Sequence, residues 1–281
     1  MTAFTVDTEL GRLHVESRAG RDRSRPPVLL WHSMFVDSRS WGRLVPLLGD
    51  RDVFLVDGPS SGQSEPLRAP ADIPACARAA ASIVETVGAR TGARDVDWVG
   101  TAWGGHVGME LAATRPDLVR SLVAISAPTF PVPPALRAKV RVLLPLYRLV
   151  GPRGPVRSAI VETLFTDATR RDDPDAVALL DDSLRGSGRA MVAAVQTAIV
   201  NRTDLLTAAT RITCPTLLVA TDDRGEWTGG QAQEAAEVMR DARVVTIPAA
   251  RVIPALEQPR ATADAIMGFW AEVAGRVSPS P

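Results

Sequence analysis

Residues 100–105, Gly-Thr-Ala-Trp-Gly-Gly, join a short apolar run to a stretch with helical spacing. Glycines lie two residues before and two residues after Ala102, and such small residues let a strand and a helix meet closely at a sharp turn. The backbone N–H groups at the start of the helix favour negative charge nearby. The segment therefore predicts an electropositive turn whose central residue has no reactive side chain.

Few other side chains could do acid–base or nucleophilic chemistry. The three histidines, His14, His32 and His106, all precede residue 107, whereas Asp223 follows an apolar run near the other end of the chain. Two cysteines are too few for a four-ligand zinc site, and no phosphate-binding glycine loop follows a predicted strand. We therefore expect no metal and no cofactor.

The elements that position these residues alternate between strands and helices, which predicts a mainly parallel sheet covered on both faces. Apolar runs predict eight strands, at 4–6, 13–15, 28–31, 53–56, 96–99, 122–125, 216–220 and 244–247. Apolar residues that recur at three- and four-residue steps predict helices at 73–87, 103–114, 229–240 and 260–274.

One long stretch contains no strand pattern. Residues from Pro131 to about 206 show good helical spacing, and the stretch opens with a proline-rich junction at 130–134. We therefore expect a core made of residues 1–128 and 206–281, with residues 129–205 inserted between two core strands as a helical lid.

Five segments in the same order resemble those of the α/β-hydrolase family. Residues 100–104 are similar to its nucleophile elbow, G-x-S-x-G, except that Ala102 stands where serine belongs. The others are 29–34 with Trp41, the D-x-x-G-x-G-x-S-like loop 57–64, the acid-bearing strand 214–223 and the histidine loop 248–259. The resemblance spans about residues 5–128 and 206–275. It implies an α/β-hydrolase fold with a mainly parallel eight-stranded sheet and an inserted helical lid.

The residues of the family's catalytic triad are not all present. The resemblance places the acid at Asp223 and puts Val252 in the position of the histidine. The family's chain order is serine, acid and then histidine, and no histidine follows Asp223 in this sequence. We therefore expect an atypical member without the catalytic serine and histidine, similar in this respect to bottromycin-type peptide epimerases.

The resemblance also implies an oxyanion hole made of the backbone N–H groups of Met34 and Trp103, which does not depend on the missing side chains. Such donors contribute about 10²–10³ in rate. Ser33, Ala102 and Val252 are expected to line the substrate pocket. Asp223 and His32 are the candidate catalytic side chains, each with a structural alternative: a turn carboxylate for Asp223 and a loop-fixing imidazole for His32.

Three functions remain open from the sequence. The one we expect is a non-hydrolytic enzyme, of the isomerase, epimerase, lyase or cyclase type, that combines the oxyanion hole with substrate-assisted proton transfer. Its substrate would be a peptide-like compound or natural product under the lid. The second is a ligand-binding protein without turnover, similar to some plant hormone receptors of this fold. The third is a hydrolase with a site rebuilt around His32 or His106.

Composition and charge exclude several classes of partner. The 281 residues contain 32 basic and 32 acidic side chains without a basic face, so we expect no nucleic-acid partner. No apolar run approaches the ~20 residues that span a bilayer, and no signal pattern opens the chain. We therefore expect a cytoplasmic protein whose partner is a small molecule or a peptide.

Overall fold

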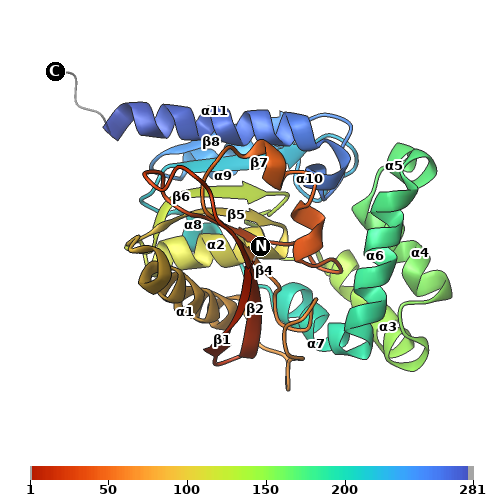
Figure 1. Cartoon of the computed structure of the whole chain (residues 1–281). Helices are drawn as coiled ribbons and strands as arrows, with labels where there is room; N and C mark the ends of the chain where they lie inside the picture. The colour runs from red at the N-terminus through yellow and green to blue at the C-terminus, as the bar shows by residue number, and fades with distance from the viewer. Residues whose placement is uncertain (1, 278–281) are drawn as a thin grey trace.

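A computed structural model describes residues 2–277, and its centre is one eight-stranded sheet (Figure 1). The order across the sheet is β1-β2-β4-β3-β5-β6-β7-β8; β2 pairs antiparallel with β1 and β4, and the other neighbours are parallel. The expected mainly parallel sheet is thereby confirmed. The strands are β1 (Thr2–Thr8), β2 (Gly11–Arg18), β3 (Val28–Trp31), β4 (Val53–Val56), β5 (Val96–Thr101), β6 (Val119–Ile125), β7 (Thr216–Thr221) and β8 (Ala242–Ile247).

The central strands are buried on both faces, which explains their uninterrupted apolar sequences. In β3, Leu29 and Trp31 belong to the core on one face of the sheet, whereas Val28 and Leu30 belong to the core on the other. Successive side chains of a strand point to opposite faces, so a strand covered on both sides needs apolar residues at every position.

Helices cover the two faces of the sheet (Figure 1). The core on one face includes side chains of α1 (Ile73–Thr91), α2 (Trp103–Thr114) and α9 (Gly229–Glu237), and α11 (Pro259–Val277) packs on the other. Short elements complete the core: η1 (Ser38–Trp41), η2 (Val45–Leu47), α8 (Leu206–Ala209) and α10 (Pro254–Glu257). Within residues 2–277, no helix has the length and apolar character needed to cross a membrane.

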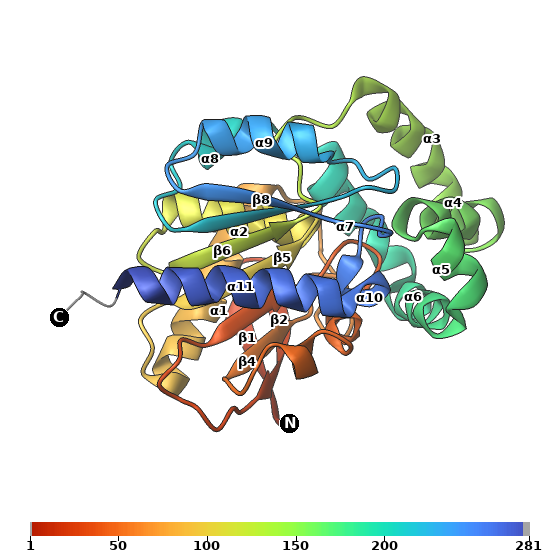
Figure 2. The same cartoon turned by 90° about the horizontal axis from the view of Figure 1, so that it is seen from above.

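Residues 126–215, which connect β6 to β7, form helices and loops without a strand. Figures 1 and 2 both show α3 to α6 standing to one side of the sheet. The helices of this insertion are α3 (Pro134–Val150), α4 (Gly154–Leu164), α5 (Asp167–Asp172), α6 (Pro174–Ser187), η3 (Gly188–Ala190), α7 (Met191–Val195) and η4 (Gln196–Val200). We call residues 129–205 the lid.

Candidate active site

A tight turn joins β5 to α2, and Ala102 is its central residue. Ala102 has φ 47° and ψ −106°, its N–H donates to the carbonyl oxygen of Ile125 at 2.7 Å, and its own oxygen accepts from the N–H of His106 at 2.9 Å. A Cβ on Gly100 would overlap the carbonyl oxygen of Gly104, so only glycine fits at the end of this strand. Gly100 therefore permits the close contact between strand and helix, and Ala102 adopts a backbone conformation that L residues rarely adopt.

Two more residues near Ala102 have positive φ angles although they are not glycine. Phe35 follows β3 with φ 73°, and Ser126 follows β6 with φ 48°. All three line one pocket. Such conformations cost roughly 1–3 kcal/mol each and cluster at ligand-binding and active sites, so this pocket is the candidate active site.

The pocket has a volume of about 70 Å³ and lies between the ends of the core strands and the lid. It brings together five residues that the sequence assigned to the site: Ser33, Met34, Ala102, Trp103 and Val252. Its other lining residues are Phe35, His106, Ser126, Thr163, Leu164, Ala198, Ile199, Arg202 and Glu226. We call this space the elbow pocket.

Backbone donors at the elbow pocket are available for a ligand. Trp103 is the first residue of α2, and neither its N–H nor that of Met34 donates a hydrogen bond to another residue in the range 2–277. The indole of Trp103 packs edge-on against Trp31, with ring centroids 6.1 Å apart, which holds the start of the helix in place. These two N–H groups can therefore act as preorganised donors to an oxygen.

His32 fixes the loop after β3. Its Nδ1 lies 2.6 Å from the carbonyl oxygen of Ser33, and the N–H of Gly58 donates to its Nε2 at 2.8 Å. The ring is therefore neutral, with the proton on Nδ1 donated to Ser33. In this geometry both ring nitrogens of His32 are engaged by backbone groups of Ser33 and Gly58.

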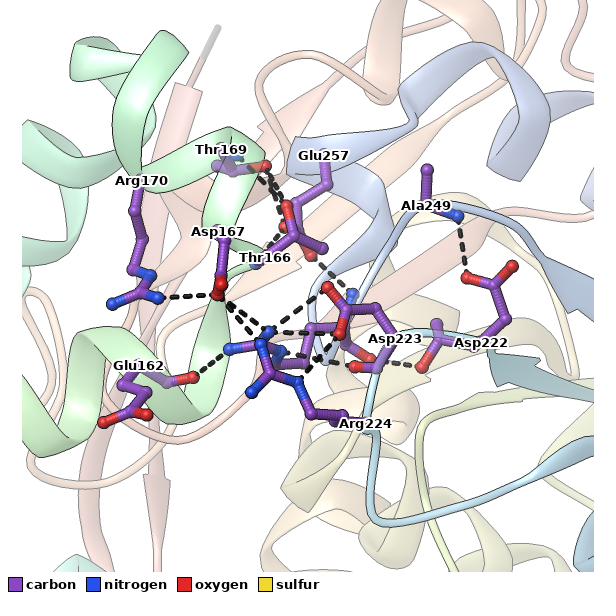
Figure 3. Close-up of polar contacts among 12 residues, drawn as sticks. Glu162, Thr166, Asp167, Thr169, Arg170, Asp222, Asp223, Arg224, Ala249 and Glu257 are labelled. Atoms are coloured by element: carbon purple, nitrogen blue, oxygen red, sulfur yellow. Dashed lines mark hydrogen bonds and ion pairs between the residues drawn. The ribbon is translucent and has the colours of Figure 1, made fainter.

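Asp223 has a different partner from the one the triad pattern would give it. Arg251 Nη2 lies 3.1 and 3.2 Å from its two carboxylate oxygens. Arg224 Nε lies 3.3 Å from one of them (Figure 3). Asp223 does not line the elbow pocket, whereas Val252, next to Arg251, does. The structure therefore does not support the expected role of Asp223 as an acid or base in that pocket.

Arg251 also reaches the lid, because its guanidinium is buried between the two parts of the molecule. Its Nη1 donates to the carbonyl oxygen of Glu162, and its Nη2 lies 3.3 Å from Asp167. Beside it, Glu257 accepts from the N–H of Arg251 and from the N–H of Thr166, both at 2.8 Å. These contacts hold the lid against the loop that follows β8.

His106 is the imidazole that the elbow pocket does contain. Its Nε2 lies 3.2 Å from the carbonyl oxygen of Pro128, and its buried Nδ1 has no hydrogen-bond partner in the described part of the chain. Burial, followed by the positive charge of Arg202, holds the pKa of His106 well below its usual value. At neutral pH the ring is therefore uncharged, with a proton on Nε2 and an open lone pair on Nδ1.

From the sequence, His106 is named only in the third alternative, a hydrolase with a rebuilt site. The available signal was its position four residues after Ala102, which places both residues on one side of the turn and helix. Arg202 and Glu226 carried no signal in the sequence, because only the tertiary fold brings the end of the lid and the loop after β7 to the pocket.

Other candidates for nucleophile or ligand in the described chain are inert. The hydroxyls of Ser33 and Ser126 line the pocket but bond to no base among residues 2–277. Burial raises the pKa of both Cys76 and Cys214 to about 12, so these thiols stay protonated at neutral pH. Within the same range, no three His, Cys, Asp or Glu side chains are grouped to hold a metal ion.

Comparison with known proteins identifies the family. The profile described as "Alpha/beta hydrolase family" matches residues 28–265. The chain belongs to the alpha/beta hydrolase family. One relative in this family is "Putative carbamate hydrolase RutD" of Pseudomonas savastanoi pv. phaseolicola, 31% identical over 236 residues that cover 79% of this chain and 85% of that protein.

Solved structures of α/β hydrolases show the same fold. A thermophilic esterase from Thermogutta terrifontis, with malate bound, has a TM-score of 0.85 at 21% identity and covers 97% of this chain and 99% of its own. The enol-lactonase from Burkholderia xenovorans LB400 has a TM-score of 0.84 at 21% identity, covering 95% and 100%. At this identity the two structures show a shared fold.

Proposed function

We propose that this alpha/beta hydrolase family member is an enzyme of carbonyl chemistry that works without a covalent intermediate. The N–H groups of Met34 and Trp103 hold the carbonyl oxygen of an acyl substrate, and Nδ1 of His106 accepts a proton. The observation that supports this most directly is an uncharged imidazole, His106, which lines the same pocket as the two donors and whose buried Nδ1 has no partner among residues 2–277. The reaction class is isomerisation, epimerisation, elimination or cyclisation at the carbon beside the carbonyl.

The proposed step is a proton transfer. Nδ1 of His106 takes a proton from the carbon next to the carbonyl, and the electron pair of that C–H bond moves onto the carbonyl oxygen. The resulting enolate oxygen is stabilised by the two backbone N–H groups. Returning the proton to the other face of the carbon, or to another atom, completes the reaction and restores neutral His106. A positioned base of this kind contributes about 10²–10⁴ in rate.

Several features argue against an acyl-serine route. Ala102, at the centre of the elbow, ends in a methyl group, and the hydroxyls of Ser33 and Ser126 have no base partner among the described residues. Asp223, which could orient a base, is engaged by Arg251. A hydroxyl without a base is a weak nucleophile at neutral pH.

Hydrolysis by direct attack of water is the second candidate. The relatives and structural neighbours are named as a carbamate hydrolase, an esterase and an enol-lactonase. His106 favours this alternative as well, because a neutral imidazole can take a proton from water while the same donors hold the tetrahedral oxyanion. The two candidates differ in the group that gives its proton to His106, a C–H beside the carbonyl or a water molecule. They also differ in the oxyanion formed, which is an enolate in the first and a tetrahedral intermediate that expels the leaving group in the second.

Deuterium exchange separates these functions. Hexanoyl and succinyl thioesters of N-acetylcysteamine would be incubated with the protein in D₂O, and NMR would follow both deuterium beside the carbonyl and release of free acid. We expect the unchanged protein to catalyse deuterium exchange and the His106→Gln variant to catalyse none. The rate of acid release should be the same in these two proteins. His14→Gln, which removes an imidazole outside the pocket, is the matched control.

Each other outcome has a definite meaning. Acid release that depends on His106 would favour hydrolysis by activated water. Exchange and acid release that are both independent of His106 would contradict the proposal and favour a ligand-binding role without turnover.

A further inference from the structure

Arg202 follows the last helix of the lid and lines the elbow pocket, with only 4% of its side chain exposed. Nη1 forms a long ion pair with Glu226, at 3.7 Å, which is beyond hydrogen-bond distance. Nη1 also lies 3.5 Å from Nε2 of His106, but both of those nitrogens are donors when His106 bonds to Pro128. Nε and Nη2 of Arg202 have no partner among residues 2–277.

This arrangement is costly for the folded protein. Burial lowers the pKa of Arg202, with Glu226 opposing the shift and Arg137 adding to it, yet the guanidinium remains charged at neutral pH. Buried charges in proteins are normally both paired and hydrogen-bonded, because desolvation otherwise destabilises the fold. A buried guanidinium without short protein partners therefore points to a role in binding rather than in stability.

The unpartnered atoms are the two donors of one guanidinium edge. Nε–H and Nη2–H point the same way and match the two oxygens of a carboxylate. The chain uses this edge for carboxylates elsewhere, at distances of 2.6–3.0 Å: Arg39 with Asp37, Arg115 with Asp117, Arg157 with Asp181, and Arg171 with Asp172.

An apolar cavity of about 110 Å³ lies beside the elbow pocket. Residues of α3 and α4, such as Leu143 and Ile160, form its walls. Four residues line both spaces, which places them next to each other: Phe35, Thr163, Ile199 and Glu226. An engineered cavity of about 150 Å³ is large enough for benzene, so this smaller cavity suits a short aliphatic chain.

We propose that Arg202 binds a carboxylate of the substrate and that the adjacent cavity holds a short aliphatic part of the same molecule. The substrates are then small acyl compounds that carry a free carboxylate near the reacting carbonyl. This inference deepens the proposed function and rests on it, because both use the elbow pocket. Its test measures binding alone, so it can fail or succeed independently of catalysis.

The experiment titrates the protein with acetate, butyrate and hexanoate by calorimetry, each beside its neutral amide. A charged bidentate pair favours the carboxylate, so we expect hexanoate to bind at least about tenfold more tightly than hexanamide. Arg202→Gln should remove this preference without weakening hexanamide. Arg202→Lys keeps the charge but lacks the planar pair of guanidinium donors, so it should retain only part of the preference for hexanoate over hexanamide. Arg137→Gln, which removes a nearby arginine outside the pocket, should keep it.

Two results would overturn the inference. One is that none of the three carboxylates binds in the millimolar range, or that none is preferred over its amide. The other is a preference that survives Arg202→Gln. Urea unfolding gives a second measurement: a binding role predicts that Arg202→Gln is at least as stable as the unchanged protein. Clear destabilisation of this variant, with unchanged carboxylate binding, would assign Arg202 a structural role.

Discussion

Arg251 lies one residue before Val252 and binds Asp223, with Nη2 3.1 and 3.2 Å from the two carboxylate oxygens. In the triad pattern, the acid at Asp223 would instead orient a histidine at position 252. The side chain of Arg251 is only 3% exposed and also contacts Asp167 of the lid. The carboxylate thereby becomes part of the attachment between lid and core.

The first prediction concerns this attachment. Arg251→Gln should lower the free energy of unfolding by about 2 kcal/mol, because it removes the charged hydrogen bonds that the buried guanidinium makes to Glu162 and Asp223. Arg224→Gln should change it by less than about 1 kcal/mol, since Arg224 contacts the same two carboxylates, Asp223 and Asp167, from an exposed position. Urea unfolding curves of both variants test this prediction. Equal losses of unfolding free energy would show that the buried position of Arg251 adds nothing to stability.

The second prediction concerns restoration of a triad. Ala102→Ser combined with Val252→His should hydrolyse p-nitrophenyl acetate no faster than Ala102→Ser alone, because Arg251 holds the carboxylate of Asp223. Adding Arg251→Ser should free Asp223 and raise the rate by at least about tenfold, since an unoriented histidine costs as much as 10⁴ in a serine protease. A double variant that is already much faster than the single one would show that Asp223 can reach position 252.

The third prediction is a pH dependence of stability that arises from His106. Burial and Arg202 depress its pKa in the folded state, whereas the unfolded chain binds a proton near the usual value of about 6.5. The unfolded state therefore binds more protons below that pH, and the stability contribution of His106 is lost as the pH falls. The expected slope is at most about 1.4 kcal/mol per pH unit.

Unfolding of the unchanged protein and of His106→Gln between pH 5 and 8 measures this contribution. The difference in unfolding free energy between them should be constant above about pH 7 and shift against the unchanged protein below about pH 6.5. A difference that is flat over the whole range would mean that His106 takes up a proton equally in both states.

The fourth prediction links Arg202 to His106. A carboxylate bound by Arg202 offsets the positive charge that helps to depress the pKa of His106, so the pKa should rise on binding. Hexanoate binding below about pH 6.5 should therefore be accompanied by proton uptake, measured by calorimetry in buffers of different ionisation enthalpy. No uptake is expected at pH 8 or in Arg202→Gln. Equal uptake in that variant would assign the proton to another group.

Local sequence patterns predicted the scaffold well, because apolar runs and helical spacing depend on neighbouring residues. The bounds of β3, β4 and α2 agree with the expected 28–31, 53–56 and 103–114, whereas α1 extends four residues beyond 87 and ends before Gly92, which has φ 79°. The family resemblance also predicted that Ala102 and Val252 line one pocket. Both residues do line the elbow pocket, although 150 positions separate them in the sequence.

The chemistry of the site was harder to predict, because it depends on contacts between distant segments. The pairing of Asp223 with Arg251 joins two loops, and no local pattern distinguishes that arginine from the 30 others. The open nitrogen of His106 depends on the carbonyl of Pro128, and the burial of Arg202 depends on how the lid folds. The same patterns therefore could not separate His106 from His32 as the available imidazole.

In the proposed function, the acyl oxygen of a bound ligand lies against the N–H groups of Met34 and Trp103. The most direct measurement is the ¹³C NMR shift of a hexanoyl thioester labelled at its carbonyl carbon, recorded free and bound. We predict a downfield shift on binding, in the unchanged protein and in His106→Gln alike, because two preorganised donors polarise the carbonyl. A bound thioester whose carbonyl signal stays at its position in water would contradict the account.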